Sequence, residues 1–298
     1  MNLAPIILFV YNRPEHTKKT VQALKLNHLV SDSSLFIFSD SYKNETDRKN
    51  VEVVRDYIST IFGFKEIKIT LKDKNLGLAD SVISGVTEVI NKFGKAIVLE
   101  DDIVTSPNFL KFMNEALDFY EKDERIFSIS GYNFPIKIPK SYEHKIYISP
   151  RPSSWGWATW KDRWSKVEWE PQRILDIKNK KAVRNLLDKA GKDLAPMLLK
   201  SLDRRISSWA VKFAYAQIKN DAYCLYPFKS FAKNIGADAT GTNFIRRTNK
   251  YDVELELHFN QFDFVNDLKL NKEFVEQIEK LVRPGIISYL KYRLFNIY

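Results

Sequence analysis

Three adjacent acidic residues end the segment "KAIVLEDD" and raise the question of what balances their charge. Glu100, Asp101 and Asp102 follow a short apolar run that is typical of a buried strand. Side chains alternate along an extended chain, so Glu100 and Asp102 are expected on one face and Asp101 on the other. Like charges at this spacing raise one another's pKa unless a cation is close. A divalent ion that bridges carboxylate to diphosphate would remove the repulsion, and a solvated loop is the alternative.

Helix capping does not account for the acidic run. Acidic residues often cap helices, and a helix is expected just downstream. The segment "SPNF" already offers a cap, with Ser106 as the N-cap and Pro107 at the first helical position. Asp101 and Asp102 lie four or five residues before that cap. The metal site and the solvated loop therefore both stay open on spacing alone.

The acidic run belongs to a regular alternation of strands and helices in the first half of the chain. Apolar runs predict strands at 5–10, 34–39, 66–71, 96–99 and 126–131, and amphipathic segments predict helices at 14–26, 45–62, 78–93 and 107–120. This alternation predicts an α/β fold with a mainly parallel sheet flanked by helices. In such sheets ligands bind outside the carboxyl ends of the strands.

The residues that leave the first four predicted strands are polar. They read "YNRPE", "DSYKN", "KDKNLG" and "EDD", and together they offer carboxylates, amides and cations at one edge of the sheet. Gly77 in "KNLGLADS" precedes a predicted helix, where a glycine permits a tight turn. The same glycine would also let backbone amides at the start of the helix approach a phosphate.

The alternation ends after Gly131. A tryptophan-rich segment "SSWGWATWKDRW" comes next, followed by two or three helical stretches between 174 and 220, a short strand at 222–227 and the loop "NIGADATGTNFIRRTNK". No Gly/Ser linker separates the halves, so the second half is expected to pack against the first sheet. Trp155 and Trp157 are predicted in a loop, where exposed aromatic rings stack on sugars, and core packing is the alternative.

Composition limits the classes of function. The chain has 298 residues, a formal net charge of +10 and a sequence pI near 9.3, which suits a nucleic acid, an anionic membrane surface or a phosphorylated substrate. Cys224 is the single cysteine, which excludes an intrachain disulfide and a cysteine-rich metal site. No apolar run approaches the roughly 18 residues of a membrane span, and no signal-peptide pattern is complete. A cytoplasmic, non-spanning protein is expected.

The segments "PIILFVYNRPEHT", "SDSYKN", "KNLGLADSVISG", "IVLEDDIVTSPNFL" and "SISGYN" together resemble GT-A-type nucleotide-sugar glycosyltransferases of a bacterial family-2-like group. The acidic motif is similar to that of the Golgi N-acetylglucosaminyltransferases, and the resemblance extends through "WGWATWKDRW", "SSWAVKF" and "CLYPFKSFAKNIGADATGTN". It implies a GT-A (Rossmann-like) domain at 1–245, with a nucleotide-binding half at 1–131 and an acceptor half at 132–245. A helical C-terminal extension at 246–298 would follow.

The resemblance also implies a donor site that uses Mn²⁺ or Mg²⁺. Asp102 would bind the metal directly, while Glu100 and Asp101 would support it or touch the ribose. The remaining residues of the donor site are implied to be Tyr11, Asn12 and Arg13 in the nucleotide pocket, Asp40 as acceptor from the base or ribose, and Lys74, Asn75 and Gly77 beside the nucleotide and diphosphate.

The catalytic base is where this sequence departs from the family. An inverting transfer needs a base for the acceptor hydroxyl, and relatives carry an acid just before the tryptophan of "SSWAVKF". Here that place holds Ser207 and Ser208. Asp203, one helical turn earlier, and Asp238 in "GADATGTN" are the two candidates, and a surface ion pair is the alternative for Asp203. The four histidines, which match no motif position, are expected at the surface or in packing: His16, His28, His144 and His258.

The sequence thus predicts a metal-dependent hexosyltransferase of polysaccharide biosynthesis. It would move a sugar from a nucleotide-sugar, expected to be a UDP-sugar, to a glycan or lipid-linked acceptor with inversion. A nucleotidyltransferase is one alternative, but it would need a glycine- and arginine-rich loop after the first strand, and "YNRPEHT" has no glycine. A nucleic-acid-binding protein is the other. The basic residues are scattered and no binding motif appears, so no nucleic-acid partner is expected.

The C-terminal residues 280–298 carry Lys280, Arg283, Lys291 and Arg293 and no acid. Apolar residues recur among them at near-helical spacing after Pro284. One interpretation is a final helix packed on the domain. The other is a basic amphipathic helix on an anionic bilayer, which would place the protein at the inner face of the cell membrane, next to a lipid-linked acceptor.

Overall fold

The computed structural model describes residues 2–170, 180–238 and 248–285. Within these residues an eight-stranded sheet has the order β3-β2-β1-β4-β8-β6-β9-β7, and β10 and β5 form a second small sheet. The strands are β1 (Ile6–Val10), β2 (Ser34–Ser39), β3 (Glu66–Leu71), β4 (Lys95–Glu100), β5 (Ile103–Thr105), β6 (Ile126–Ser130), β7 (Ile146–Ser149), β8 (Trp157–Trp160), β9 (Tyr223–Pro227) and β10 (Ala232–Asn234).

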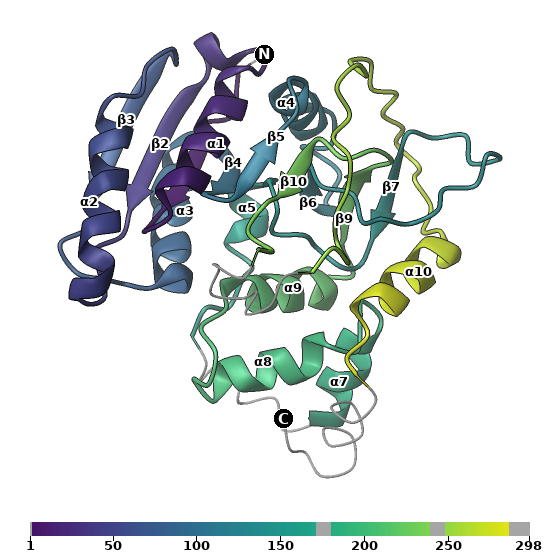
Figure 1. Ribbon diagram of the computed structural model, residues 1–298. Coiled ribbons are helices and arrows are strands. Elements are labelled where there is room, and N and C mark those ends of the chain that lie inside the picture. The colour runs from purple at the N-terminus through teal and green to yellow at the C-terminus, as the bar shows by residue number, and fades with distance from the viewer. Residues whose placement is uncertain (1, 171–179, 239–247, 286–298) are drawn as a thin grey trace.

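The large sheet is mainly parallel. Strands β3, β2, β1 and β4 pair in parallel, as do β6 and β9, while β8 and β7 run antiparallel to their neighbours. The second half of the chain adds β7, β8 and β9 to the sheet that the first half begins (Figure 1). The predicted α/β class with a mainly parallel sheet is therefore confirmed.

Helices cover both faces of this sheet (Figure 1). Apolar residues of α1, α2 and α4 pack on one face, and those of α3 and α9 pack on the other. The helices are α1 (Pro14–Lys25), η1 (Val30–Asp32), α2 (Glu45–Ser59), α3 (Leu78–Phe93), α4 (Phe109–Phe119), α5 (Lys161–Trp164), α7 (Lys180–Asp188), α8 (Leu194–Leu202), α9 (Trp209–Lys219) and α10 (Lys272–Val282).

Helices α7, α8 and α9 form a separate packing layer. Buried residues of all three, including Leu187, Leu198 and Ala214, make one apolar cluster. In Figure 1, α9 lies between the sheet and α8, so one side of α9 packs on the sheet and another on α8. This layer lies next to the end of the sheet where the candidate site is found.

The start of α4 differs from the prediction. The sequence predicts Ser106 as the N-cap, but the helix begins at Phe109 with Asn108 as the N-cap residue. The amide of Ser106 instead donates to the carbonyl of Phe231, 2.8 Å away, next to the β5–β10 pair. This hydrogen bond continues the pairing of β5 with β10 by one residue, so Ser106 follows the strand and does not cap the helix. The capping prediction is wrong.

The described part of the C-terminal region packs on the core. Helix α10 buries Phe274, Ile278 and Val282, and the ring of Phe274 contacts Tyr142 and Tyr147. Most of the predicted basic amphipathic segment, from 286 to 298, lies outside the described residues. Among the residues that are described, no helix is both long and apolar enough to cross a membrane.

Candidate active site

The acidic run covers the last residue of β4, Glu100, and the turn to β5, and Arg13 contacts the two aspartates of that turn. Arg13 directly precedes α1, at the exit of β1, which is the parallel neighbour of β4. Its Nη2 donates to Asp101 Oδ1 and, at 2.9 Å, to Asp102 Oδ2. Both carboxylates are buried, with 4% and 7% of their residues exposed. Among the residues that the structure describes, Arg13 is therefore the cation that balances the charge of Asp101 and Asp102.

The three carboxyl groups differ in their surroundings. Burial, followed by the charges of Asp102 and Asp101, raises the pKa of Glu100 to about 8, and Arg13 opposes this shift. Burial also raises the pKa of Asp101, although the charge of Arg13 opposes it most strongly. The indole of Trp209, at the start of α9, is a hydrogen-bond partner of Glu100. Glu100 is therefore expected to hold its proton at neutral pH.

This arrangement predicts how Glu100→Gln changes stability with pH. A carboxyl group with a raised pKa in the folded state contributes full stability below its unfolded pKa of about 4.5 and loses it as pH rises through about 8. Glutamine keeps a hydrogen-bond acceptor for Trp209 and carries no charge. Relative to wild type, Glu100→Gln should gain up to about 4 kcal/mol, or several degrees in Tm, between pH 4.5 and 8.5.

Thermal melts of both proteins at several pH values test this. The control is Glu88→Gln, which removes an exposed carboxylate that pairs with Lys68 at 3.0 Å. A Tm difference for Glu100→Gln that stays constant from pH 5 to 8.5, or that reverses sign, would contradict a buried, protonated Glu100.

Residues 235–238 close over the acid cluster. The amide of Ile235 donates to the carbonyl of Asp102 at 2.9 Å. A Cβ atom on Gly236 would overlap Asp102 Oδ2 and lie 2.8 Å from Arg13 Nη1, so a larger residue here would displace these side chains. Arg13 Nη1 and Asp102 Oδ1 are buried and have no hydrogen-bond partner among the described residues. The acid cluster thus contains one hydrogen-bond donor, on Arg13, and one acceptor, on Asp102, that are not used by described residues.

His16 joins this site through Asp238. Its Nε2 lies 3.2 Å from Asp238 Oδ2, and its side chain is largely buried. The sequence predicts His16 only as a surface or packing residue, and its contact with Asp238 places it beside the acid cluster. The signal that could have found it is its position in the first turn of α1, three residues after Arg13.

Tyr11 and Asn12 converge on Asp47, which the sequence analysis did not single out. The hydroxyl of Tyr11 donates to Asp47 Oδ2 at 2.8 Å, and Asn12 Nδ2 donates to Asp47 Oδ1 at 2.9 Å. Burial, and next the hydrogen bond to Asp47, raise the pKa of Tyr11 to about 12. These contacts fix the exit of β1 against the first turn of α2, beside the acid cluster.

Asp40 organises the loop before α3. Its carboxylate accepts hydrogen bonds from the amides of Ser41, Leu76 and Gly77 at 2.9 to 3.2 Å. Asn75 Nδ2 donates to the carbonyl of Ser41 at 2.6 Å. Gly77 has φ +77°, a conformation that favours glycine. Asp40 and Asn75 therefore shape the loop, while Lys74 is exposed; their contacts with a nucleotide stay predictions.

The two tryptophans proposed to meet a sugar lie in different environments. Trp157 belongs to β8, is 1% exposed and packs against Trp164 and Trp209, so the prediction that it lies in an exposed loop is wrong. The side chain of Trp157 packs in the apolar cluster between the sheet and α9. Trp155 precedes the strand and is partly buried against Tyr132 and Tyr251. Trp155 alone keeps the predicted loop position.

The two candidate bases are also separated. Helix α8 ends at Leu202, and Asp203 is its C-cap residue, so Asp203 and Ser207 do not share a helical face as predicted. Asp203 forms an exposed ion pair with Arg205 at 2.9 Å. Asp238 instead follows the Gly236 segment that touches Asp102 and Arg13. Ser208 caps α9 through a hydrogen bond from the amide of Val211.

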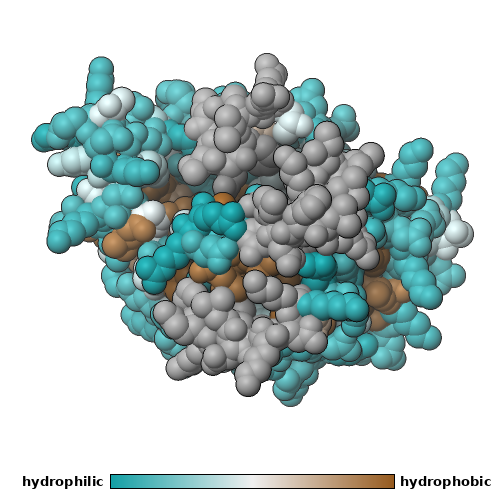
Figure 2. Space-filling model, turned by 90° about the horizontal axis from the view of Figure 1, so that it is seen from below, coloured by the Kyte–Doolittle hydropathy of each residue, from teal (hydrophilic) through white to brown (hydrophobic). Residues whose placement is uncertain are grey.

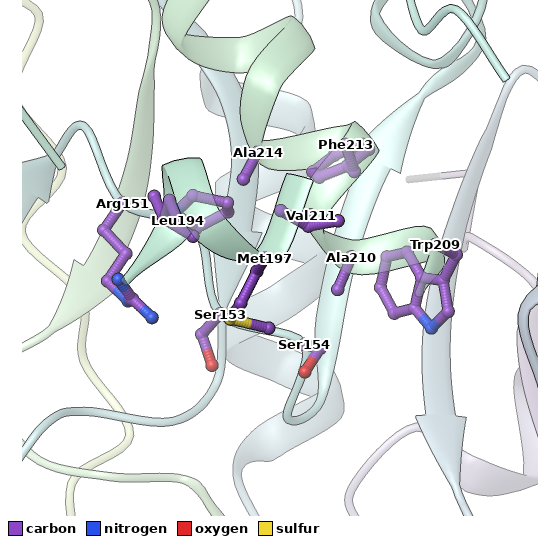
Figure 3. A pocket seen from close by; sticks show the side chains of 11 residues that line it. Arg151, Ser153, Ser154, Leu194, Met197, Trp209, Ala210, Val211, Phe213 and Ala214 are labelled. Carbon is purple, nitrogen blue, oxygen red and sulfur yellow. The ribbon is translucent and has the colours of Figure 1, made fainter. Parts of the chain in front are cut away.

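A pocket of about 160 Å³ opens between α8, α9 and residues 151–154 (Figure 3). Its walls are mainly small or apolar and include Leu194, Met197, Ala210, Val211 and Ala214. Trp209 also lines it, so this one side chain contacts both the pocket and Glu100. Seen from below, apolar residues show in the middle of a largely hydrophilic face (Figure 2).

The polar groups of the pocket are Arg151, Ser153 and Ser154. Arg151 is held in place by two 2.8 Å hydrogen bonds to the carboxylate of Asp193, and Ser153 accepts a hydrogen bond from the amide of Trp155. The pocket therefore combines an apolar wall with fixed polar groups at its edge, close to the strand-end site.

The residues present fit a divalent ion only in part. In the parts of the chain that the structure describes, no three His, Cys, Asp or Glu side chains come together as a metal-binding group. Asp102 nevertheless has a buried oxygen, Oδ1, with which no described residue forms a hydrogen bond. Mg²⁺ and similar ions are often held by one or two carboxylates with phosphate oxygens and water. Asp102 Oδ1 fits such a site.

No protein family model matches the chain. Solved structures that are similar to it include a fragment of TarS from S. aureus, with 10% identity, a TM-score of 0.43, and coverage of 76% of this chain and 59% of that chain. A mannosyltransferase from Pyrobaculum calidifontis in complex with GDP-Man and Mn²⁺ has 10% identity and a TM-score of 0.36, with 54% and 48% covered. UDP-glucose pyrophosphorylase in complex with UDP-glucose has 10% identity and a TM-score of 0.37, with 76% and 90% covered. All three TM-scores are below 0.5, so the function rests on the chain's own residues.

Proposed function

We propose that the chain is a glycosyltransferase that binds a nucleotide-sugar at the carboxyl ends of β1, β2 and β4 and transfers the sugar to an acceptor. The observation that carries this proposal is the convergence of Arg13, Asp101 and Asp102 at neighbouring strand ends, beneath Gly236. One arginine and one open carboxylate oxygen in a partly buried site suit a diphosphate and its counter-ion. The GT-A resemblance of the sequence supports the same assignment.

The donor would lie between the acid cluster and the start of α3. Asp40 holds the amides of Leu76 and Gly77 in a fixed turn, and the first-turn amides of a 16-residue helix follow. A helix N-terminus of this kind favours a phosphate. Tyr11 and Asn12, fixed by Asp47, would flank the nucleoside. We propose UDP as the nucleotide from the family resemblance.

Asp102 would hold Mn²⁺ or Mg²⁺ through its open oxygen. The ion would stabilise the negative charge that builds up on the departing nucleoside diphosphate. Arg13 contributes a second positive charge at the same end of the site. Glu100 and Asp101 would set the electrostatic surroundings of Asp102, because they directly precede it in the chain.

The pocket at α8 and α9 is the proposed acceptor side. It adjoins the donor site through Trp209 and has room for one ring-sized or acetamido-sized group against an apolar wall. Asp238, which His16 orients, is the base we propose for an inverting transfer, because the segment that carries it contacts Asp102 and Arg13. The acceptor is then a glycan or a lipid-linked glycan.

Filling the pocket should weaken acceptor binding and leave donor chemistry intact. Ala210→Leu adds three carbon atoms to the wall that faces Met197. We expect the KM for a glycan acceptor to rise about tenfold, which corresponds to about 1.4 kcal/mol. Hydrolysis of the donor without acceptor should stay within about twofold of wild type. Ala182→Leu, at an exposed position of α7, is the matched control. An unchanged KM for Ala210→Leu would exclude the pocket as the acceptor site.

A panel of nucleotide-sugars tests the proposed activity as a whole. Each nucleotide-sugar is incubated with the protein in the presence and in the absence of Mn²⁺. The nucleoside diphosphate and the free sugar that form are then measured. The proposal expects both products from at least one UDP-sugar, with a faster reaction in Mn²⁺. Formation of nucleoside triphosphate and sugar phosphate when pyrophosphate is added would instead identify a nucleotidyltransferase.

A further inference from the structure

The contacts of Arg13 point to a role beyond lining the donor site. Its Nη2 is shared between Asp101 and Asp102, so one nitrogen occupies an oxygen of each carboxylate. Its Nη1 is buried and makes no hydrogen bond with a described residue. A guanidinium that leaves a buried N–H group unpaired is an incomplete fit, since such a group costs about 1–3 kcal/mol. Arg13 therefore has unused capacity for an anionic ligand.

The same contacts restrict Asp102. One of its two oxygens is used by Arg13, and the other is the buried Oδ1 without a described partner. The amide of Ile235 holds the backbone carbonyl of Asp102, and the close approach of Gly236 limits the space around the carboxylate. A divalent ion that met this site alone would find one oxygen and a positive charge beside it. At about 4 Å, a neighbouring cation opposes a second one appreciably, even at the dielectric of a protein surface.

We infer that Arg13 is an internal counter-cation that keeps Asp102 from binding a divalent ion until a nucleoside diphosphate is present. The inference rests on the proposed function and adds the order in which the site fills. Without donor, Arg13 neutralises the buried pair. When a diphosphate enters, its oxygens compete for the guanidinium through charge-assisted hydrogen bonds. Asp102 is then released as a ligand, so ion and nucleotide bind together.

A permanent structural ion pair is the competing interpretation of Arg13. A buried ion pair can be retained without any change during function, and removing one partner is usually destabilising by about 3–5 kcal/mol. The two interpretations differ in one measurable quantity, which is the affinity for Mn²⁺ in the absence of nucleotide. A permanent pair gives no reason for that affinity to rise when Arg13 is removed and the charge balance is kept.

The decisive variant is Arg13→Met/Asp101→Asn. It removes one positive and one negative charge, so the net charge of the cluster is unchanged, and it leaves Asp102 free of its guanidinium partner. Arg48→Met, which removes an exposed arginine that pairs with Glu52, is the control. Free Mn²⁺ is measured by electron paramagnetic resonance in titrations of folded protein, with and without UDP. Arg13→Gln/Asp101→Asn, which keeps N–H donors at residue 13 and the same net charge, serves as a second test if the first double variant does not fold.

Wild type and Arg48→Met should bind Mn²⁺ weakly alone and at least about tenfold more tightly with UDP. Either double variant should bind Mn²⁺ at least about tenfold more tightly than wild type when UDP is absent. Equal Mn²⁺ affinity of wild type with and without UDP, in protein shown to bind UDP, would overturn the inference, as would folded variants that gain no affinity. If the variants gain affinity but wild type never binds UDP, the counter-cation role stands and the proposed donor fails.

Discussion

Asp102→Asn should lower the release of nucleoside diphosphate from the donor by about 10²-fold or more. The substitution keeps the shape of the side chain but removes the charge that would hold a divalent ion at the exit of β4. A hundredfold loss corresponds to about 2.7 kcal/mol of transition-state stabilisation, which is within the range expected for a metal ligand. Initial rates with saturating donor and Mn²⁺ give the measurement.

The matched control for this variant is Asp118→Asn. Asp118 is a partly exposed carboxylate on α4 that pairs with Lys95. Lys95 is the first residue of β4, at the opposite end of the strand from the acid cluster. We expect its activity to stay within about twofold of wild type. Wild-type activity in Asp102→Asn, or activity that excess chelator does not change, would contradict the assignment of Asp102 as a metal ligand.

Gly236→Ala should have an effect of similar size without any change of charge. The added methyl group would overlap Asp102 Oδ2 and crowd Arg13 Nη1, so both side chains would have to move. A displacement of about 1 Å in reacting groups can cost about 10²-fold in rate. We expect the affinity for UDP in Mn²⁺ and the rate of donor hydrolysis both to fall by tenfold or more.

Gly285→Ala provides the control, because a Cβ atom at residue 285 would meet nothing within 4 Å. Its donor affinity and rate should equal those of wild type. Circular dichroism melts show whether the Gly236→Ala variant stays folded. A folded Gly236→Ala protein with unchanged donor affinity would mean that the segment around Asp238 does not cover the donor site.

The sequence predicted the first half of the fold well, because its signals are local. Apolar runs identified β2 and β3 at their observed bounds, and the periodicity of 78–93 identified α3. The rule that parallel strands gather their carboxyl ends then brought the exits of β1 and β4 together before any coordinates were known. Arg13 and the acidic run meet for that reason.

The remaining features depend on contacts between distant segments. Strand β8 is too short to be recognised, and only its pairing with β4 and β6 makes Trp157 a buried residue. Asp47 looks like an ordinary first-turn acid of α2 until Tyr11 and Asn12 are placed beside it. His16 gains significance only from the return of the chain at Asp238, 222 residues later. No local sequence pattern predicts these contacts, because the residues that form them are far apart in the chain.

A calorimetric titration of UDP into the chain tests the central claim most directly. The donor site at the ends of β1 and β4 predicts saturable binding of one UDP in Mn²⁺, weaker by at least about tenfold in excess chelator and in Asp102→Asn. Glu88→Gln, which lies on the exposed side of α3, should bind UDP as wild type does. The absence of saturable heat for UDP and other nucleoside diphosphates in Mn²⁺, from protein that melts cooperatively, would contradict the account.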